Sequence, residues 1–290
     1  MTRAASGTMR SVLITGTSTG IGQATAVVLA SRGWRVFATM QDLEERGPLD
    51  QAVKQAGVQD RVIVEQLDVT SAASITSAVA STLSQTGDKL EAVVHNAGVA
   101  TAGALEDVPE SELRRVMETN FFGVVTLTRA LLPTFRAQGR GRLAIVSSEA
   151  AFMGRPTISI YCASKWALEG WAEAIAYELE PFGIKVILIE PGPYRTEIWE
   201  RAPRFQPPDS PYHAWVEHIF RAGLTHAENV ARDPEEVAVV IAGAIESRRP
   251  RFRYPVGPSA RLGHFLKGKI PSRLLRRVIT RSLGLSKKRQ

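Results

Sequence analysis

The chain has 290 residues, of which 44% are hydrophobic and 22% charged, which is typical of a globular protein with one large core. Its net charge of +7 is unevenly distributed. Residues 247–290 hold 14 Lys and Arg and no Asp or Glu, which leaves 22 basic against 29 acidic residues in the rest. We therefore interpret an acidic body and a basic C-terminal part separately.

The chain contains one cysteine, Cys162, which excludes an intramolecular disulfide and favours a reducing, cytoplasmic setting. We interpret Cys162 as a buried structural thiol. Residues 1–9 contain no apolar signal segment, and we expect a flexible tail there. No stretch approaches the roughly 18 consecutive apolar residues that a membrane-spanning helix needs.

Short apolar runs alternate with longer helical patterns along the chain. Apolar runs without polar alternation suit strands that are buried on both faces, as in a parallel sheet covered by helices. We predict strands at 12–14, 36–38, 62–64, 92–94, 143–146, 186–189 and, more weakly, 252–256. We predict helices at 20–31, 44–56, 71–84, 111–132, 160–180 and 234–246. This order predicts an α/β, doubly wound (Rossmann) three-layer sandwich with a mainly parallel seven-stranded sheet.

The first predicted strand runs into a glycine-rich turn, TGTSTGIG at residues 15–22, which leads into a helix. Glycines in such a turn allow a tight bend and let backbone N–H groups approach a diphosphate at the helix N-terminus. The spacing is GxxxGxG rather than GxGxxG, but it stands at the same place in the strand–turn–helix unit. The turn predicts a phosphate-binding site.

Polar or small residues follow three further predicted strands. They are His95-Asn96-Ala97-Gly98, Ser147-Ser148 and Glu190-Pro191-Gly192-Pro193. Ligands of open α/β sheets bind outside the carboxyl ends of the strands. We therefore expect these segments and the glycine-rich turn to form one site.

Tyr161 and Lys165 are four residues apart at the start of a predicted helix, so they share one helix face. A nearby ammonium favours the phenolate, so we expect Lys165 to lower the pKa of Tyr161. That would make Tyr161 a proton donor and acceptor near neutral pH.

Over about residues 10–200 the chain resembles the short-chain dehydrogenase/reductase family. The motifs that carry the resemblance are TGTSTGIG (15–22), LDV (67–69), HNAG (95–98) where the family usually has NNAG, Asn120, Ser148, YCASK (161–165) and PGPYRT (191–196). The resemblance implies a catalytic domain over residues 10–258, a substrate lid at about 193–233 and a C-terminal extension at 259–290.

The resemblance implies hydride transfer between a nicotinamide cofactor and a carbonyl or secondary alcohol. Tyr161 would donate or remove the proton, and Ser148 would hydrogen-bond the same oxygen, where negative charge develops. Lys165 would also hold the nicotinamide ribose, and Asn120 would position a water that relays protons to Lys165. A plainer interpretation of Asn120 is a bond to a neighbouring helix.

The resemblance also implies a set of cofactor contacts. Asn96 would brace the central strands, and Asp68 would accept from the adenine amino group. The whole set is Gly16, Thr17, Ser18, Thr19, Gly20, Ile21, Gly22, Met40, Gln41, Asp68, Val69, Asn96, Ala97, Gly98, Pro191, Gly192, Tyr194 and Thr196, together with Tyr161 and Lys165. No metal site is expected, because the histidines at 213, 218 and 226 lack a metal-binding spacing.

The residue after the second strand decides the choice of cofactor, because a carboxylate there accepts from the NAD ribose and repels the NADP phosphate. By the spacing of the resembled family that position is Met40, and the next residue is Gln41, so the usual acid is missing. We therefore expect NADP(H) to be preferred over NAD(H).

The segment after Tyr194 breaks the strand–helix alternation and is rich in aromatic and apolar side chains. They predict either an apolar pocket for a hydrophobic or aromatic carbonyl compound, or a lid held down by apolar contacts. The set is Trp199, Phe205, Tyr212, Trp215, Ile219 and Phe220, with Phe152 and Met153 as further candidates. The extension beyond the usual core resembles that of bacterial relatives of hydroxysteroid and retinol dehydrogenases, which implies a steroid-, retinoid- or aromatic-ketone-like substrate.

The C-terminal extension contains a basic amphipathic helical pattern. Arg273, Arg276, Arg277 and Arg281 lie opposite an apolar face formed by Ile270, Leu274, Leu275, Val278, Ile279 and Leu283. We expect this helix to pack on the acidic body or on a partner subunit; peripheral contact with an anionic membrane is the alternative. No recognition module for nucleic acid accompanies the charge.

Two other functions fit the same motifs. One is a ketoreductase that acts on acyl chains bound to a carrier protein, and the other is a non-catalytic regulator that binds the cofactor. The sequence leaves the substrate, the reaction direction and a homo-oligomeric state open.

Overall fold

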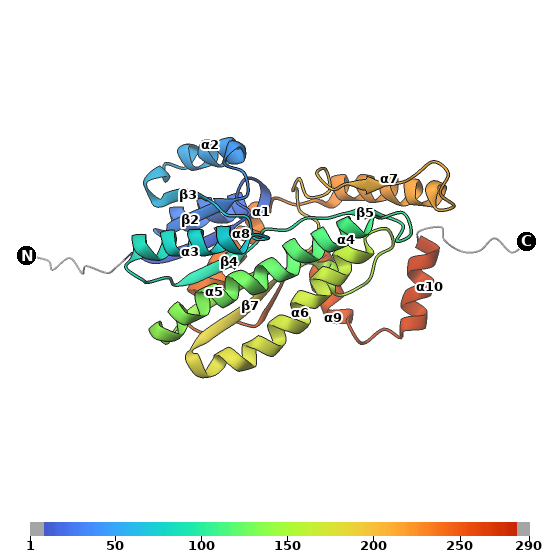
Figure 1. Cartoon of the computed structure of the whole chain (residues 1–290). Coiled ribbons are helices and arrows are strands. Elements are labelled where there is room, and N and C mark those ends of the chain that lie inside the picture. The colour runs from blue at the N-terminus through green and yellow to red at the C-terminus, as the bar shows by residue number, and fades with distance from the viewer. Residues whose placement is uncertain (1–8, 283–290) are drawn as a thin grey trace, which may run out of the picture.

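The computed structural model describes residues 9–282, except for the side chains of residues 224–229, 272, 275 and 282. As predicted, seven parallel strands form one sheet and helices cover both of its faces (Figure 1). The strand order is β3-β2-β1-β4-β6-β7-β9. The strands are β1 Ser11–Thr15, β2 Arg35–Met40, β3 Val62–Gln66, β4 Ala92–His95, β6 Gly141–Val146, β7 Ile184–Pro191 and β9 Arg253–Val256.

The helices are α1 Gly20–Ser31, α2 Gly47–Gln55, α3 Ala72–Thr86, α4 Glu110–Met117, α5 Gly123–Gln138, α6 Ser159–Leu179, α7 His213–Val230, α8 Pro234–Glu246, α9 Pro258–Leu266 and α10 Ser272–Ser282. Those that the sequence predicts lie close to their expected positions. The single helix expected at 111–132 is divided into α4 and α5 by a π-helical turn, Glu118–Phe122.

Two hydrophobic cores lie on opposite faces of the sheet. One packs α1, α2 and α8 against side chains such as Val12, Ile14 and Ile187. The other packs α3, α5 and α6 against the alternate side chains of the same strands, such as Leu13 and Leu188. Because neighbouring residues of a strand face opposite sides, strands buried on both faces appear in the sequence as unbroken apolar runs.

Three elements were not predicted. Strands β5, Ala102–Gly103, and β8, Arg204–Phe205, form a separate two-stranded sheet, which is too short to leave a pattern in the sequence. A Cβ on Gly103 would lie 2.7 Å from the Phe205 carbonyl oxygen, so this pairing depends on a glycine. Helix α9 follows β9 directly and packs against it.

The C-terminal helix differs from its expected packing on the acidic body. Leu274 and Val278 of α10 are more than half exposed, and Figure 1 shows α10 standing clear of the helices that cover the sheet. Among residues 9–282, no carboxylate pairs with the arginines of α10. The expected tail at 1–9 falls outside the described residues except for Met9, as does Leu283 of the expected apolar face.

Candidate active site

The predicted site segments meet at one edge of the sheet. Strands β1, β4, β6 and β7 are neighbours and run in parallel, so their carboxyl ends lie side by side. The glycine-rich turn follows β1, the Asn96–Gly98 segment follows β4, Ser147 and Ser148 follow β6, and β7 ends at Pro191. This edge is where a doubly wound fold binds its ligand.

The glycine-rich turn is packed too tightly for side chains at two of its glycines. Gly16 has a φ of +69°, and a Cβ there would lie 2.8 Å from the Ala97 Cα. A Cβ on Gly22 would lie 2.1 Å from the Gly16 carbonyl oxygen and 2.4 Å from the Asn96 amide nitrogen. The first turn of α1 therefore lies directly against the loop before it.

The N-terminus of α1 fits a diphosphate. Its N-cap residue, Thr19, makes no side-chain capping bond, so the first backbone N–H groups of the helix are not capped by that hydroxyl. These N–H groups and the helix dipole favour an anion. The Thr196 methyl lies 3.1 Å from where a Cβ on Gly20 would stand, which places Thr196 beside the same helix end.

Replacing Gly22 by Ala is expected to lower the free energy of unfolding by about 1–3 kcal/mol, because the added methyl overlaps the Gly16 backbone. The displaced turn should also weaken cofactor binding. Urea unfolding and fluorescence titration with NADPH measure the two effects. Gly170→Ala in α6 is the matched control, since a Cβ there meets nothing within 4 Å. Equal behaviour of the two variants would contradict the packing argument.

Three predicted cofactor residues have side chains that point elsewhere. Thr17 is fully buried, and its backbone N–H and hydroxyl both donate to the Thr39 carbonyl oxygen, at 3.0 and 3.1 Å. Met40 and Tyr194 lie in the core with α1 and α8 and are 2% and 8% exposed. These three side chains are part of the core, so a contact of Thr17, Met40 or Tyr194 with the cofactor would have to come from the backbone. Ile21 also packs against this core, so its backbone alone faces the turn.

Two further predicted cofactor residues, Gln41 after β2 and Asp68 after β3, contact each other. Gln41 is exposed, and its amide nitrogen donates to the Asp68 carboxylate at 3.3 Å. Burial acts to raise the pKa of Asp68, but hydrogen bonds from Thr70 and Gln41 outweigh it, so the pKa is lowered. Asp68 is therefore an ionised acceptor at this edge, next to Val69, which packs against Gly123 at the start of α5.

Asn96 joins the ends of β1 and β4. Its amide nitrogen donates to the carbonyl oxygens of Thr15 and Gly16, at 3.0 and 2.8 Å. The Thr15 hydroxyl accepts from the backbone N–H groups of Asn96 and Ala97, both at 3.0 Å. The glycine-rich turn and the segment after β4 are thus held in a fixed relation.

His95, where the resembled family usually has Asn, is a core residue. It is 2% exposed, and its Nε2 lies 3.0 Å from the Thr128 hydroxyl. Burial lowers its pKa to about 3, so the imidazole is neutral at physiological pH. His95 therefore stabilises the end of β4 next to the site, through packing and one hydrogen bond with Thr128 of α5.

The unfolded chain takes up a proton on His95 below pH 6.5, whereas the folded chain does so only near pH 3. Stability should therefore be lost as pH falls, by about 2 kcal/mol for this group between pH 6.5 and 5. Replacing His95 by Gln is expected to remove that part of the loss. Urea unfolding at pH 7 and pH 5 measures it, with His218→Gln as the exposed control. An unchanged pH dependence in His95→Gln would contradict the assignment.

Tyr161 and Lys165 lie in the first two turns of α6 and are both buried. The Lys165 Nζ lies 5.8 Å from the centre of the Tyr161 ring and donates to the Val146 carbonyl oxygen at 2.9 Å. Ser148 stands beside Tyr161, where its hydroxyl acts to lower the pKa of the phenol, and the same hydroxyl accepts from the Ala150 N–H at 3.1 Å. The neighbouring Ser147 hydroxyl is buried without a hydrogen-bond partner among residues 9–282.

The expected lowering of the Tyr161 pKa is wrong for this structure. Burial raises the pKa of Tyr161 to about 12, and the hydrogen bond with Ser148 only partly opposes it. Burial lowers the pKa of Lys165 to about 8. The physical reason is that Lys165 is directed to the Val146 carbonyl, while the phenol is enclosed by apolar side chains.

Asn120 stands in the π-helical turn between α4 and α5 and is 1% exposed. Its Oδ1 accepts from the Val99 N–H at 2.8 Å, and its Nδ2 donates to the Val99 carbonyl at 2.9 Å and to the Ser164 hydroxyl at 3.0 Å. That hydroxyl donates to the Tyr161 carbonyl at 2.8 Å. Asn120 thus ties the segment after β4 to the first turn of α6.

Gly98 lies beside two of these polar groups, and its lack of a side chain leaves space next to them. A Cβ there would lie 3.4 Å from the Asn120 Oδ1 and 3.8 Å from the Lys165 Nζ. The amide and the ammonium therefore lie on the same side of Gly98.

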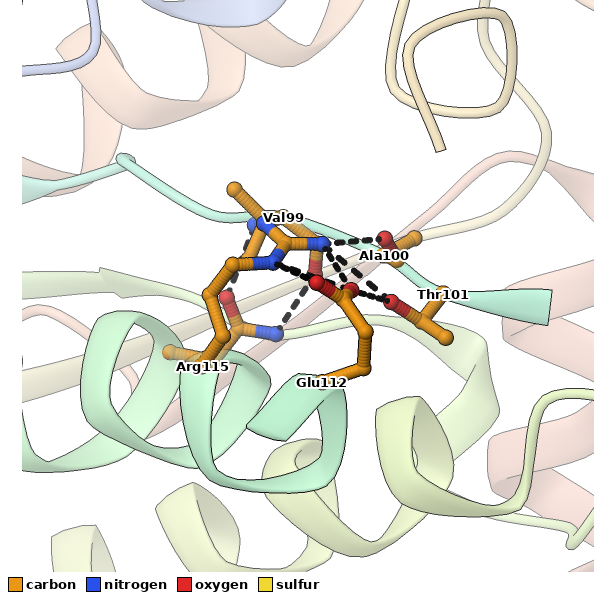
Figure 2. A network of polar contacts seen from close by, with 6 residues as sticks. Val99, Ala100, Thr101, Glu112 and Arg115 are labelled. Carbon is orange, nitrogen blue, oxygen red and sulfur yellow. Dashed lines mark hydrogen bonds and ion pairs between the residues drawn. The ribbon is translucent and has the colours of Figure 1, made fainter. Parts of the chain in front are cut away.

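A second polar network supports the same segment and was not found from the sequence (Figure 2). Arg115 of α4 donates to the Ala100 carbonyl and to the Thr101 hydroxyl, both at 3.2 Å, and pairs with Glu112 at 2.8 Å. Thr101 also donates to Glu112 at 2.8 Å. The only signal was the i,i+3 spacing of Glu112 and Arg115, which is common on exposed helices.

Trp199 covers Tyr161. The two rings meet edge to face, with centroids 5.2 Å apart, within a small apolar cluster that includes Ala100, Ala150, Cys162, Ala202 and Ile198. Arg201 pairs with Glu45 at 2.8 Å, which fastens this segment to the turn after β2. Cys162 is buried in the same cluster, in agreement with a structural thiol.

The other aromatic residues expected above the site are distributed among different contacts. Phe205 belongs to β8, Tyr212 donates to Glu106 at 2.8 Å and meets Trp215, and Phe220 lies under Arg204. Phe152 packs against His264 of α9. Gly192 bonds to Val256 and approaches Ser259, so the end of β7 is joined to β9 and α9.

Comparisons with known proteins agree with this arrangement. Residues 10–206 match the short chain dehydrogenase family. Human 17-beta-hydroxysteroid dehydrogenase type 1 is 36% identical over 84% of this chain and 76% of its own, and retinol dehydrogenase 8 from Bos taurus is 35% identical over 84% and 80%. The crystal structure of a short-chain dehydrogenase from Streptomyces avermitilis has a TM-score of 0.78 at 31% identity, over 98% of this chain and 100% of that one.

Proposed function

The chain belongs to the short-chain dehydrogenase/reductase family of NAD(P)-dependent oxidoreductases, and on this premise we propose that it reduces the carbonyl group of a hydrophobic substrate or oxidises the corresponding secondary alcohol. The observation that carries the proposal is the enclosure of Tyr161, Ser148 and Lys165 at the carboxyl edge of the sheet, beneath Trp199.

The proposed roles follow from the contacts of each residue. Tyr161 donates its proton to the substrate oxygen, and Ser148, which stands beside Tyr161, hydrogen-bonds the same oxygen. Lys165 would hold the nicotinamide ribose, and Asn120, which lies on the same side of Gly98, would position a water that relays protons to Lys165. When bound, the reduced nicotinamide supplies the hydride to the carbonyl carbon.

The cofactor is proposed to lie along the edge of the sheet. The N-terminus of α1 and Thr196 would hold the diphosphate, and Asp68 would accept from the adenine amino group. Ser18 and Thr19 are half-buried in the turn, where their polar groups are open to the phosphates. No acid replaces Met40 or Gln41 at the end of β2, which supports a preference for NADP(H). Tighter binding of NADH than of NADPH in a fluorescence titration would overturn that preference.

The segment at about 193–233 is proposed to act as the substrate lid, and the substrate to be apolar. Trp199 and Ile198 offer an apolar surface to whatever binds at Tyr161. The names of two similar proteins, 17-beta-hydroxysteroid dehydrogenase type 1 and retinol dehydrogenase 8, point to steroid- and retinoid-like compounds as the first to test.

Replacing Trp199 by Ala is expected to raise the KM for a bulky hydrophobic ketone about tenfold or more, because the indole face that packs on the substrate is lost. The kcat should change much less, since Trp199 donates no proton. Steady-state kinetics separate the two constants, and Trp215→Ala, on α7, is the control. A reduced KM in Trp199→Ala would show that the indole blocks the site instead of lining it.

The overall proposal is tested by following NADPH and NADH absorbance with a panel of steroid, retinoid and aromatic ketones, short aliphatic ketones and a ketoacyl thioester. Turnover of the bulky ketones above the aliphatic ones supports the proposal. Preference for the thioester would identify a ketoreductase of carrier-bound acyl chains. Tight cofactor binding without turnover of any carbonyl would indicate a regulator.

No helix within residues 9–282 combines the length and the apolar character that crossing a bilayer requires.

A further inference from the structure

The C-terminal helices α9 and α10 carry an unbalanced positive charge. Between Ser247 and Gln290 the sequence contains no acidic residue. Four arginines of α10 (Arg273, Arg276, Arg277 and Arg281) lack a carboxylate partner within residues 9–282. In water, such a concentration of like charges repels itself, so an anionic partner would stabilise it.

The same helices expose large apolar side chains. Leu262 and Phe265 of α9 are 59% and 63% exposed, and Leu274 and Val278 of α10 are 53% and 56% exposed. Leu274 and Val278 are four residues apart, so they share one face of α10. Apolar and cationic groups thus occur together on both helices, which is the composition of a helix that lies in the interface of a membrane.

Helix α9 is fixed to the body beside the active site. The Lys267 Nζ lies over the rings of Trp166 and Phe152, at 5.1 and 5.5 Å. His264 lies 3.4 Å from Glu190 at the end of β7. Trp166 belongs to the helix that carries Tyr161, and it is 46% exposed. Helix α9, with its exposed basic and apolar residues, is therefore attached to α6, which carries Tyr161 and Lys165, and to the end of β7.

We propose that α9 and α10 bind the surface of a membrane that contains anionic phospholipids, with the arginines at the headgroups and the exposed apolar side chains in the interface. The exposed aliphatic side chains would gain nothing from a nucleic acid backbone. A symmetric contact between two copies would bring the same arginines together. The inference does not depend on the proposed substrate, because binding to vesicles can be measured without turnover.

The experiment is co-sedimentation of the full chain with phosphatidylcholine vesicles, with and without phosphatidylglycerol, at low and high salt. Binding to the anionic vesicles, with loss at high salt, is expected. The variant Arg276→Glu/Arg277→Glu should partition at least about 20-fold less, since each basic group near an anionic surface contributes about fivefold. The control Lys54→Glu/Lys89→Glu has the same change in charge at exposed sites on the body and should bind like the unchanged chain.

A second pair tests the apolar part. Leu274→Ser/Val278→Ser should bind anionic vesicles more weakly, while Leu43→Ser/Val239→Ser, which removes exposed apolar residues elsewhere, should not. Equal binding to neutral and anionic vesicles, or no binding to either, would overturn the proposal. The proposal would also be overturned if the unchanged chain formed an oligomer without binding vesicles, and if Arg276→Glu/Arg277→Glu dissociated that oligomer. The surface would then belong to a contact between copies of the chain. Urea unfolding of each variant shows that the fold is retained.

Discussion

Replacing Tyr161 by Phe is expected to lower kcat by about 10²–10⁴-fold and to leave cofactor affinity unchanged. The phenol stands beside Ser148, and the variant removes only the hydroxyl that would give a proton to the substrate oxygen. The ring, which packs against Trp199, remains, so the fold should be kept. The measurement is single-turnover reduction of a bulky ketone, together with NADPH titration by fluorescence.

The matched control is Tyr177→Phe, which makes the same change on the same helix at a side chain that is 74% exposed. Its turnover should be that of the unchanged enzyme. If Tyr161→Phe also reduced the ketone at nearly the unchanged rate, the proton would have to come from another group, and the assignment of Tyr161 would be wrong.

The raised pKa of Tyr161 bears on the direction of the reaction. With a pKa of about 12, the phenol in this closed arrangement carries its proton at every physiological pH. It is therefore prepared to donate, as carbonyl reduction requires. Alcohol oxidation requires the phenolate, and the lowering of the pKa would depend on water entering as Trp199 moves away, because burial is the main cause of the rise.

The sheet and the location of the site could be predicted because their signals are local. An apolar run such as Val186–Ile189 marks a buried strand wherever it occurs, and polar residues after several such runs meet wherever the strands are parallel neighbours. Helical spacing alone predicts that Tyr161 and Lys165 lie on the same face of one helix.

The direction of individual side chains could not be predicted in the same way. Thr17 lies in the glycine-rich turn, yet its hydroxyl bonds to Thr39 on the next strand, a contact that depends on how β1 and β2 pair. Tyr194 follows the family motif but is held in the core beside α8. The pKa of Tyr161 depends on Trp199, which is 38 residues away in the chain and leaves no sequence signal for the contact.

A cluster of carboxylates around Arg253, close to Tyr161 and Lys165 on α6, also could not be predicted from the sequence. It is expected to contribute strongly to stability. Tyr161, Lys165, Glu169 and Glu173 recur every four residues along one face of α6. Arg253 of β9 pairs with Glu169, with Glu173 at 2.8 Å and with Glu190 at 3.2 Å. The side chains of Glu169 and Glu190 are 6% and 0% exposed, so one guanidinium serves two buried carboxylates.

Replacing Arg253 by Met is therefore expected to lower the free energy of unfolding by about 3–5 kcal/mol at pH 8, because it leaves buried carboxylates without their partner. Burial already raises the pKa of Glu190 to about 7, against the opposing charge of Lys267. A carboxyl group with a raised folded-state pKa stabilises the fold at low pH and loses that stabilisation as pH rises through the folded pKa. The defect of Arg253→Met should accordingly be largest above pH 7 and shrink towards pH 5, as urea unfolding across this range will measure.

Two comparisons separate the charge effect from a loss of packing. Arg114→Met breaks an exposed ion pair with Glu110, whose side chains are 75% and 74% exposed, and should change stability by less than about 1 kcal/mol. Adding Glu169→Gln and Glu190→Gln to Arg253→Met should recover most of the lost stability, because neutral amides need no cation. A defect that is independent of pH and unrelieved by the two Gln substitutions would mean that Arg253 stabilises β9 through its aliphatic contacts, and that the carboxylates beneath the catalytic pair are held by other groups.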